Sequence, residues 1–74
     1  MVPHERIEIR PDVMFGKPVI RGTRIPVELI LRKLADREKP EDILRQHPRL
    51  TAEDIYAAQA YAADVLAGDE VAFG

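Results

Sequence analysis

The chain has 74 residues, a net charge of −2 at pH 7, two histidines and no cysteine. A chain this short forms one small domain, which buries only about 60% of the surface that its unfolded form exposes, and it has no disulfide to add stability. Its composition does not suggest a general nucleic-acid binder, for which a strongly basic domain is expected. It also excludes a membrane-spanning helix, because no apolar run approaches the ~20 residues that such a helix needs.

Residues that could carry catalysis or bind a metal are sparse. The chain contains no serine, and its two histidines, His4 and His47, lie far apart without the spacing of metal ligands. We therefore expect no enzyme activity, no metal and no cofactor. The absence of cysteine, and of the apolar core of a signal peptide at the N-terminus, predicts a cytoplasmic protein.

Charge is divided unevenly along the chain. Residues 1–50 hold all 11 Lys and Arg beside 8 acidic residues, whereas residues 51–74 hold 5 acidic residues and no Lys or Arg. A division of this kind predicts two surfaces with different partners.

Residues 6–25 are expected to form a β element. Its first five residues alternate charged and apolar side chains, which predicts a strand with Ile7 and Ile9 on the buried face. Residues 13–15 are an apolar loop segment that we expect to fold back on the core, and residues 19–20 are β-branched and predict the partner strand. Because two strands are barely stable alone in water, this pair has to pack on helices or pair with another chain.

A tight turn follows the second strand. Gly22 takes a positive φ without strain and is therefore the expected turn residue. Three cations, Lys17, Arg21 and Arg24, lie within eight residues of one another. The residues leave two interpretations open: these cations contact a partner, or they form ion pairs on the hairpin with Glu5, Glu8 or Asp12.

Three helices follow, which we expect at residues 26–36, 40–47 and 52–67. Pro26 suits the first helical position and precedes apolar residues spaced i, i+3, i+4 and i+7. Pro40 starts the second helix with two acids in its first turn, and Thr51 is the expected N-cap of the third. Gly68 suits the position that ends this helix, and the tail, residues 69–74, is expected to be frayed.

The second and third helices have the spacing of a helix-turn-helix, whose second helix enters the DNA major groove. The third helix here begins with Glu53 and Asp54 and contains no Lys or Arg, so phosphate would repel its start. On this helix, Gln59 is the side chain that suits a base. For DNA or another partner we therefore expect contact from residues that precede the helix, namely Lys17, Arg21, Thr23, Arg24, Arg45 and Arg49.

The third helix is apolar on more than one face. We expect one stripe in the core, formed by Ile55, Ala58, Ala62, Val65 and Leu66. Alanine tolerates solvent, but the second face also suits contact with another copy of the chain or with another protein. The candidate interface residues are Tyr56, Ala60, Tyr61, Ala63 and Phe73.

The string GKPVIRGTRIPV at residues 16–27 resembles the signature of the domain-of-unknown-function 433 family. The resemblance continues to about residue 66 and so covers nearly the whole chain. It implies a helix-turn-helix-like domain with an N-terminal β element. The family is similar to VapB-like antitoxins of type II toxin–antitoxin pairs, which implies a toxin with a PIN-like nuclease fold as the partner.

From these features we expect one α+β domain at residues 1–74, with a short β-hairpin or strand pair followed by a three-helix bundle resembling homeodomain and winged-helix folds. As the resemblance implies, it acts as an antitoxin that binds a PIN-like ribonuclease toxin directly. We also expect a homodimer, while binding to its own promoter DNA stays open. Arg21 and Arg24 are expected to approach the acidic site of the nuclease, because no Lys or Arg follows Arg49. Two alternatives stay open: a homodimeric DNA-binding regulator without a toxin, and a small oligomerisation or adaptor module.

Overall fold

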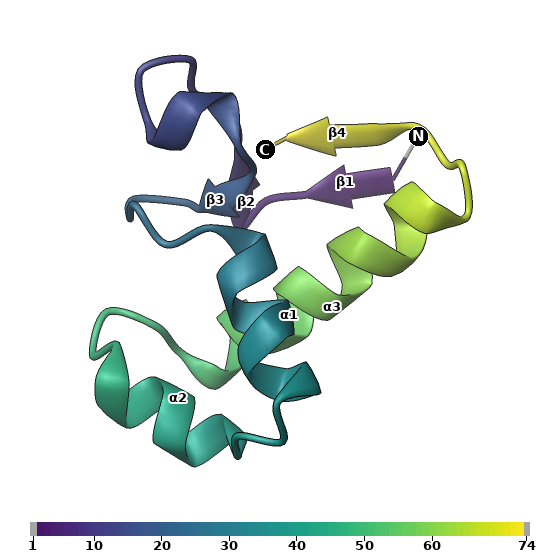
Figure 1. Cartoon of the computed structure of the whole chain (residues 1–74). Coiled ribbons are helices and arrows are strands. Elements are labelled where there is room, and N and C mark those ends of the chain that lie inside the picture. The colour runs from purple at the N-terminus through teal and green to yellow at the C-terminus, as the bar shows by residue number, and fades with distance from the viewer. Residues whose placement is uncertain (1, 74) are drawn as a thin grey trace.

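The structure is a computed structural model that describes residues 2–73. Within this range, two small sheets and three helices form an α+β fold (Figure 1). The elements are β1 Val2–His4, β2 Ile7–Glu8, the short 3₁₀ turn η1 Met14–Gly16, β3 Val19–Ile20, α1 Val27–Ala35, α2 Pro40–Gln46, α3 Ala52–Leu66 and β4 Val71–Phe73. The predicted fold class, a short antiparallel strand pair followed by three helices, is confirmed.

The predicted hairpin is the antiparallel pair of β2 and β3. Ile7 lies opposite Ile20 and Glu8 opposite Val19, and the two isoleucines are buried. Ile9 was also expected on the buried face, but β2 ends at Glu8 and the Ile9 side chain is 43% exposed. The prediction for Ile9 is wrong because alternation assigns a residue to one face only while the strand continues.

The loop between these strands folds only partly onto the core. Val13 is buried as expected, whereas Phe15 is 96% exposed, so the expectation that Phe15 packs on the core is wrong. Met14 and Phe15 have φ angles of 49° and 59°, in the left-handed region that residues other than glycine seldom adopt. Two successive left-handed residues change the direction of the backbone. The Phe15 side chain is therefore exposed to solvent, whereas the Val13 side chain is buried.

All three helices begin and end within one residue of their predicted bounds. α1 begins at Val27 because Pro26 serves as its N-cap with extended backbone angles, and α2 begins with Pro40 as predicted. Thr51 caps α3: its hydroxyl accepts a hydrogen bond from the Asp54 N–H, and the Asp54 carboxylate accepts one from the Thr51 N–H. This reciprocal pair of bonds fixes the direction in which the chain enters α3.

After α3 the chain turns back and pairs with its own beginning. Gly68 has a φ of +79°. The N–H groups of Gly68 and Asp69 bond to the carbonyls of Val65 and Asp64, which closes the helix in a Schellman motif. Residues 71–73 then form β4, which pairs in parallel with β1 (Figure 1). The expectation of a frayed tail is therefore wrong for these residues.

One apolar core joins the hairpin to the helices. Its buried members come from both hairpin strands, from all three helices and from the turn before α3: Ile7, Ile20, Val27, Ile30, Ile43, Leu50, Ile55 and Ala58. Val65 and Leu66 were expected in this core, but they are 48% and 87% exposed because they border an open groove at the end of α3. No helix in the described part of the chain has the length and apolar character needed to cross a membrane.

Candidate functional site

Arg21, one of the three predicted contact cations of the hairpin, is bonded to the strand beside it. Its Nε donates to the Glu5 carbonyl at 2.6 Å and its Nη2 to the Ile7 carbonyl at 3.3 Å. Its Nη1 lies 3.6 Å from a carboxylate oxygen of Glu8. Of the two interpretations that the sequence left open, Arg21 therefore fits the ion pair on the hairpin. Its hydrogen bonds connect the end of β3 to Glu5, which precedes β2, and to Ile7 in β2.

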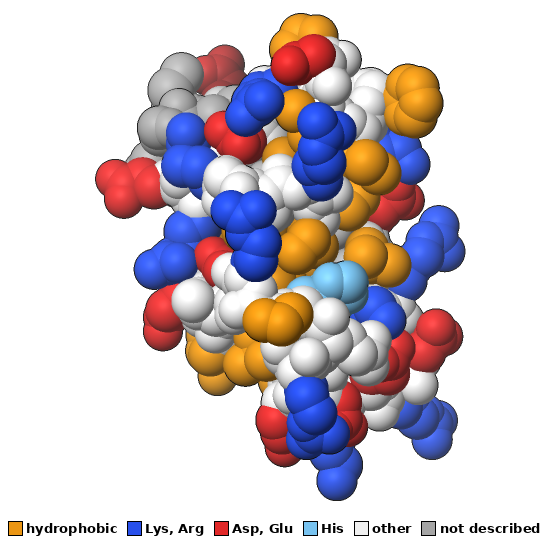
Figure 2. Space-filling view, turned by 90° about the vertical axis from the view of Figure 1, so that its left-hand side faces the viewer, with side chains coloured by type: hydrophobic (Ala, Val, Ile, Leu, Met, Phe, Trp, Pro, Cys, Tyr) orange, Lys and Arg blue, Asp and Glu red, His pale blue; other side chains and the backbone are white. Residues whose placement is uncertain are grey.

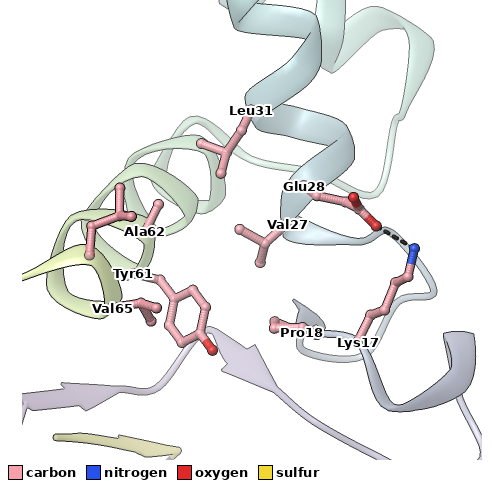
Figure 3. A pocket seen from close by; sticks show the side chains of 9 residues that line it. Lys17, Pro18, Val27, Glu28, Leu31, Tyr61, Ala62 and Val65 are labelled. Atoms are coloured by element: carbon pink, nitrogen blue, oxygen red, sulfur yellow. Dashed lines mark hydrogen bonds and ion pairs between the residues drawn. The ribbon is translucent and has the colours of Figure 1, made fainter. Parts of the chain in front are cut away.

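Lys17 also has an acidic partner. Its Nζ donates to Glu28 Oε1 at 2.5 Å, which links the loop before β3 to the first turn of α1 (Figure 3). This hydrogen bond, together with the charge of Lys17, holds the pKa of Glu28 below its ordinary value. Both side chains are about half exposed, so solvent screens the pair.

Arg24 lies in a different environment, a small basic pocket of about 210 Å³. We use the name basic pocket for the site lined by Arg10, Val13, Gly22, Thr23, Arg24 and Arg49. Within residues 2–73, neither Arg24 nor Arg49 has an ion pair or hydrogen bond from its side chain. Arg10 lies 3.8 Å from the carboxylates of Glu8 and Asp12, near the outer limit of an ion pair. The structure thus brings three predicted contact residues together, Thr23, Arg24 and Arg49, and adds Arg10, which sequence reasoning missed.

The backbone beside the basic pocket is fixed by hydrogen bonds. Gly22 has a φ of +77°, as its predicted turn position requires, and its N–H donates to Glu8 Oε1 at 3.0 Å. The Thr23 hydroxyl donates to the Ile20 carbonyl at 2.7 Å and accepts from the Ile25 N–H at 3.0 Å. Thr23 therefore stabilises the turn through its hydroxyl, and it also lines the basic pocket.

The turn before α1 and the turn between α2 and α3 lie on the same side of the molecule in Figure 1. Figure 2 shows that side, with Lys and Arg side chains around a small apolar patch.

A second hollow, which we call the apolar groove, lies between α1 and α3 (Figure 3). Its volume is about 480 Å³. It is lined by Pro18, by Val27 and Leu31 from α1, by Tyr61, Ala62, Val65 and Leu66 from α3, and by the ion-paired Lys17 and Glu28. The described part of the chain leaves this largely apolar surface uncovered.

Tyr61 contributes to the groove and packs on a buried histidine behind it. The rings of Tyr61 and His4 meet edge-on with centroids 5.3 Å apart, and burial raises the pKa of Tyr61. His4 is 7% exposed, and its Nε2 lies 2.8 Å from a carboxylate oxygen of Asp64. His4 therefore links β1 to α3. This contact supports the part of α3 from which the Tyr61 ring points into the groove (Figure 3).

The remaining predicted contact residues are spread over other surfaces. On α3, Tyr56 is 65% exposed and Ala60 and Ala63 are exposed, so these interface candidates are available to a partner. Arg45 forms an ion pair with Asp42 at 3.1 Å within α2. Phe73 belongs to β4, but its side chain lies outside the described residues.

The beginning of α3 is acidic, as predicted. Asp54 is 6% exposed because it caps the helix and lies 3.1 Å from Arg6, while Glu53 is exposed. In the described range, no group of three or more His, Cys, Asp or Glu residues is arranged to hold a metal ion. The described structure offers two candidate binding sites, the basic pocket and the apolar groove, and they are lined by separate sets of residues.

The chain is similar to known proteins in both sequence and structure. A family model described as "Protein of unknown function (DUF433)" matches residues 7–62. The chain is similar to "Uncharacterized protein y4eO" of Sinorhizobium fredii, with 39% identity over 71 residues that cover 95% of this chain and 32% of that protein. It is also similar to an uncharacterized protein of Archaeoglobus fulgidus, with 57% identity over 28 residues that cover 38% of this chain and 78% of that one.

A solved structure has the same fold. The crystal structure of a DUF433 member protein from Anabaena variabilis matches with a TM-score of 0.79 and 34% sequence identity, over 86% of this chain and 63% of that one. The chain therefore spans about a third of the Sinorhizobium relative and a little under two thirds of the Anabaena protein.

Proposed function

We propose that this chain, which belongs to the DUF433 family of proteins of unknown function, is an antitoxin that neutralises a PIN-like ribonuclease toxin by direct binding. The observation that supports this proposal is the apolar groove between α1 and α3. Val65 and Leu66 remain largely exposed along it. Exposed apolar surface with a charged rim is typical of a site that binds another protein.

The lining of the groove favours a protein over a small molecule. Small-molecule sites combine apolar walls with a few polar groups that converge on the ligand and orient it. Here the two charged residues of the lining, Lys17 and Glu28, are paired with each other. An apolar side chain on a helix or loop of the toxin needs no such orienting groups. Tyr61 is of a kind that often anchors partners, and Leu66 contributes through burial of its apolar surface.

Binding at the groove neutralises a nuclease if the bound antitoxin covers its active site. Lys17 borders the groove, where its charge is paired with that of Glu28. PIN-like nucleases, as the family resemblance implies, present clustered carboxylates. The proposal therefore rests on apolar anchoring in the groove, with the bound antitoxin covering the carboxylates of the nuclease.

The direct test is co-expression with a PIN-like nuclease encoded next to this chain, followed by size-exclusion chromatography of the complex and an RNA cleavage assay. We expect a stable complex and loss of cleavage. Val65→Gln and Leu66→Gln should each weaken the complex about tenfold or more, because a buried Val or Leu side chain contributes about 1.5–3 kcal/mol.

Ile9→Gln is the matched control, since Ile9 is 43% exposed and lies outside the groove, whereas Val65 is 48% exposed and lines it. The control variant should bind and neutralise as the unmodified chain does. Absence of any complex would reject the antitoxin proposal. A complex that the two groove variants leave unchanged would reject the groove as its binding surface.

A further inference from the structure

We propose that the basic pocket binds a phosphate group in the backbone of duplex DNA. This inference goes beyond the proposed function, because none of the residues that line the basic pocket lines the apolar groove. Three arginines, Arg10, Arg24 and Arg49, line the pocket, and no acidic residue lines it.

Two of the three pocket arginines keep their charge unpaired within the described residues. In the described structure, Arg24 and Arg49 have no acidic partner, and Arg10 approaches its two carboxylates only to 3.8 Å. One of those carboxylates, Glu8, already accepts from the Gly22 N–H at 3.0 Å. Like charges gathered at one site repel one another, so an anion bound between them is stabilised by all three.

The three arginines lie in or next to three separate turns, each of which is closed by a backbone hydrogen bond. The Val13 N–H donates to the Arg10 carbonyl at 3.0 Å, the Thr23 N–H to the Ile20 carbonyl at 3.0 Å, and the Leu50 N–H to the His47 carbonyl at 2.9 Å. Arg10 begins the first turn, Arg24 follows the second, and Arg49 lies within the third. Their backbones are therefore held in place before any ligand arrives, which lowers the entropic cost of binding.

The size and chemistry of the pocket suit a single phosphate. Its volume of about 210 Å³ lies below the ~300–1,000 Å³ of clefts that enclose whole small-molecule ligands. Guanidinium groups present several N–H donors in a plane and bind phosphate oxygens in pairs. A phosphate of a nucleic-acid backbone fits such an open site because the rest of the polymer remains outside it.

The lining residues favour duplex DNA over a single strand. Proteins that bind single-stranded nucleic acid stack aromatic side chains on the bases, and none of the residues that line the basic pocket is aromatic. Arg49 lies in the turn between α2 and α3, the two helices with helix-turn-helix spacing, and in that motif the first helix crosses the DNA backbone. Backbone contacts of this kind position a protein without reading sequence.

Fluorescence anisotropy with the full chain and a labelled duplex, over a range of salt concentrations, tests the inference. Arg24→Gln and Arg49→Gln should each weaken duplex binding about tenfold. In the double variant, the slope of log K against log salt should become shallower by about 0.9 for each phosphate contact that is removed. Arg32→Gln is the matched control, because it removes the same charge from an exposed position on α1 outside the pocket. It should leave the affinity within about twofold.

Further ligands separate the possible sources of phosphate. Inorganic phosphate should compete only weakly with the duplex, and single-stranded RNA should bind less tightly than the duplex does. No duplex binding, equal effects of pocket and control variants, or tighter binding of single-stranded RNA would each overturn the inference. Circular dichroism verifies that each variant is folded.

Toxin neutralisation by the pocket variants separates this inference from the proposed function. If Arg24→Gln and Arg49→Gln lose DNA affinity but still neutralise the toxin, the two surfaces act independently, as we expect. If they lose neutralisation and keep DNA affinity, the pocket receives toxin carboxylates and the inference is wrong.

Discussion

Asp54 has two structural tasks at the start of α3. Its carboxylate accepts the Thr51 N–H at 2.9 Å and lies 3.1 Å from Arg6, and the residue is 6% exposed. Asp54→Ala should lower the free energy of unfolding by about 1–2 kcal/mol, mostly through loss of the helix cap, because a pair with half-exposed Arg6 contributes little. Urea denaturation measures the change.

Glu53→Ala is the matched control for that prediction. Glu53 is the neighbouring acid in the same helical turn, but it is exposed and does not cap the helix. Its removal should cost only a few tenths of a kcal/mol through the helix dipole. Equal losses for the two variants would contradict the role assigned to Asp54.

The ion pair between Lys17 and Glu28 gives a pH-dependent prediction. Since the pKa of Glu28 is lowered in the folded chain, the pair stabilises the fold above the ordinary pKa of a glutamate. That contribution is lost as the pH falls through the lowered value. Lys17→Gln should raise the pKa of Glu28 toward its ordinary value, as measured by NMR titration of its side-chain carboxyl. An unchanged titration would show that Lys17 is not the cause.

Residue-level signals also explain which parts of the site could be predicted. Arg24 and Arg49 were identified as contact candidates from their type and their positions in turns. Arg10 was missed because the three turns of the basic pocket are far apart in sequence, and no local pattern indicates that they converge. The Arg21 side chain was a candidate on the same grounds, and only the fold shows its bonds to Glu5 and Ile7.

At the scale of the elements, the end of α3 depends on a glycine. Gly68 has a φ of +79°, and a Cβ built there meets no atom within 4 Å, so substitution is unfavourable through backbone conformation alone. Gly68→Ala should lower the free energy of unfolding by about 1–2 kcal/mol. Gly68→Asn should lose less, because asparagine tolerates this conformation better. Urea denaturation of both variants tests the order, and equal losses would contradict it.

The helices could be predicted from the sequence because their signals are local. Pro40, Thr51 and Gly68 act within one helical turn, and they mark boundaries that the structure reproduces to within a residue. The pairing of β1 with β4 could not be predicted, since it joins residues 2–4 to residues 71–73 through short strands without a clear period. The exposure of Leu66 was missed for a related reason: a helical pattern shows which residues share a face, and the tertiary structure decides what covers that face.

At the scale of the whole molecule, the cations lie in residues 1–50, whereas most of the large apolar side chains that are exposed in the described residues belong to α3. All Lys and Arg precede residue 51, and the residues that line the basic pocket come from positions 10–49. α3 contributes Val65 and Leu66 to the groove and presents Tyr56 on its exposed surface. A chain of this size that leaves so much apolar surface uncovered gains stability by burying it against a partner.

This distribution leads to a prediction about assembly. We expect a homodimer at micromolar concentration that uses the exposed face of α3, where Tyr56 is 65% exposed and Ala63 is exposed. Tyr56→Glu and Ala63→Glu should shift the molecular mass measured by light scattering toward the 8.4 kDa of one chain, because each places a charge in an apolar contact.

Leu66→Gln distinguishes this face from the groove. If the dimer forms through Tyr56 and Ala63, Leu66→Gln leaves the mass at that of two chains while weakening the toxin complex, and one helix then serves two partners at once. If Leu66→Gln also dissociates the dimer, the groove is shared, and toxin binding competes with self-association. A mass of one chain for the unmodified protein throughout the micromolar range would reject the dimer itself.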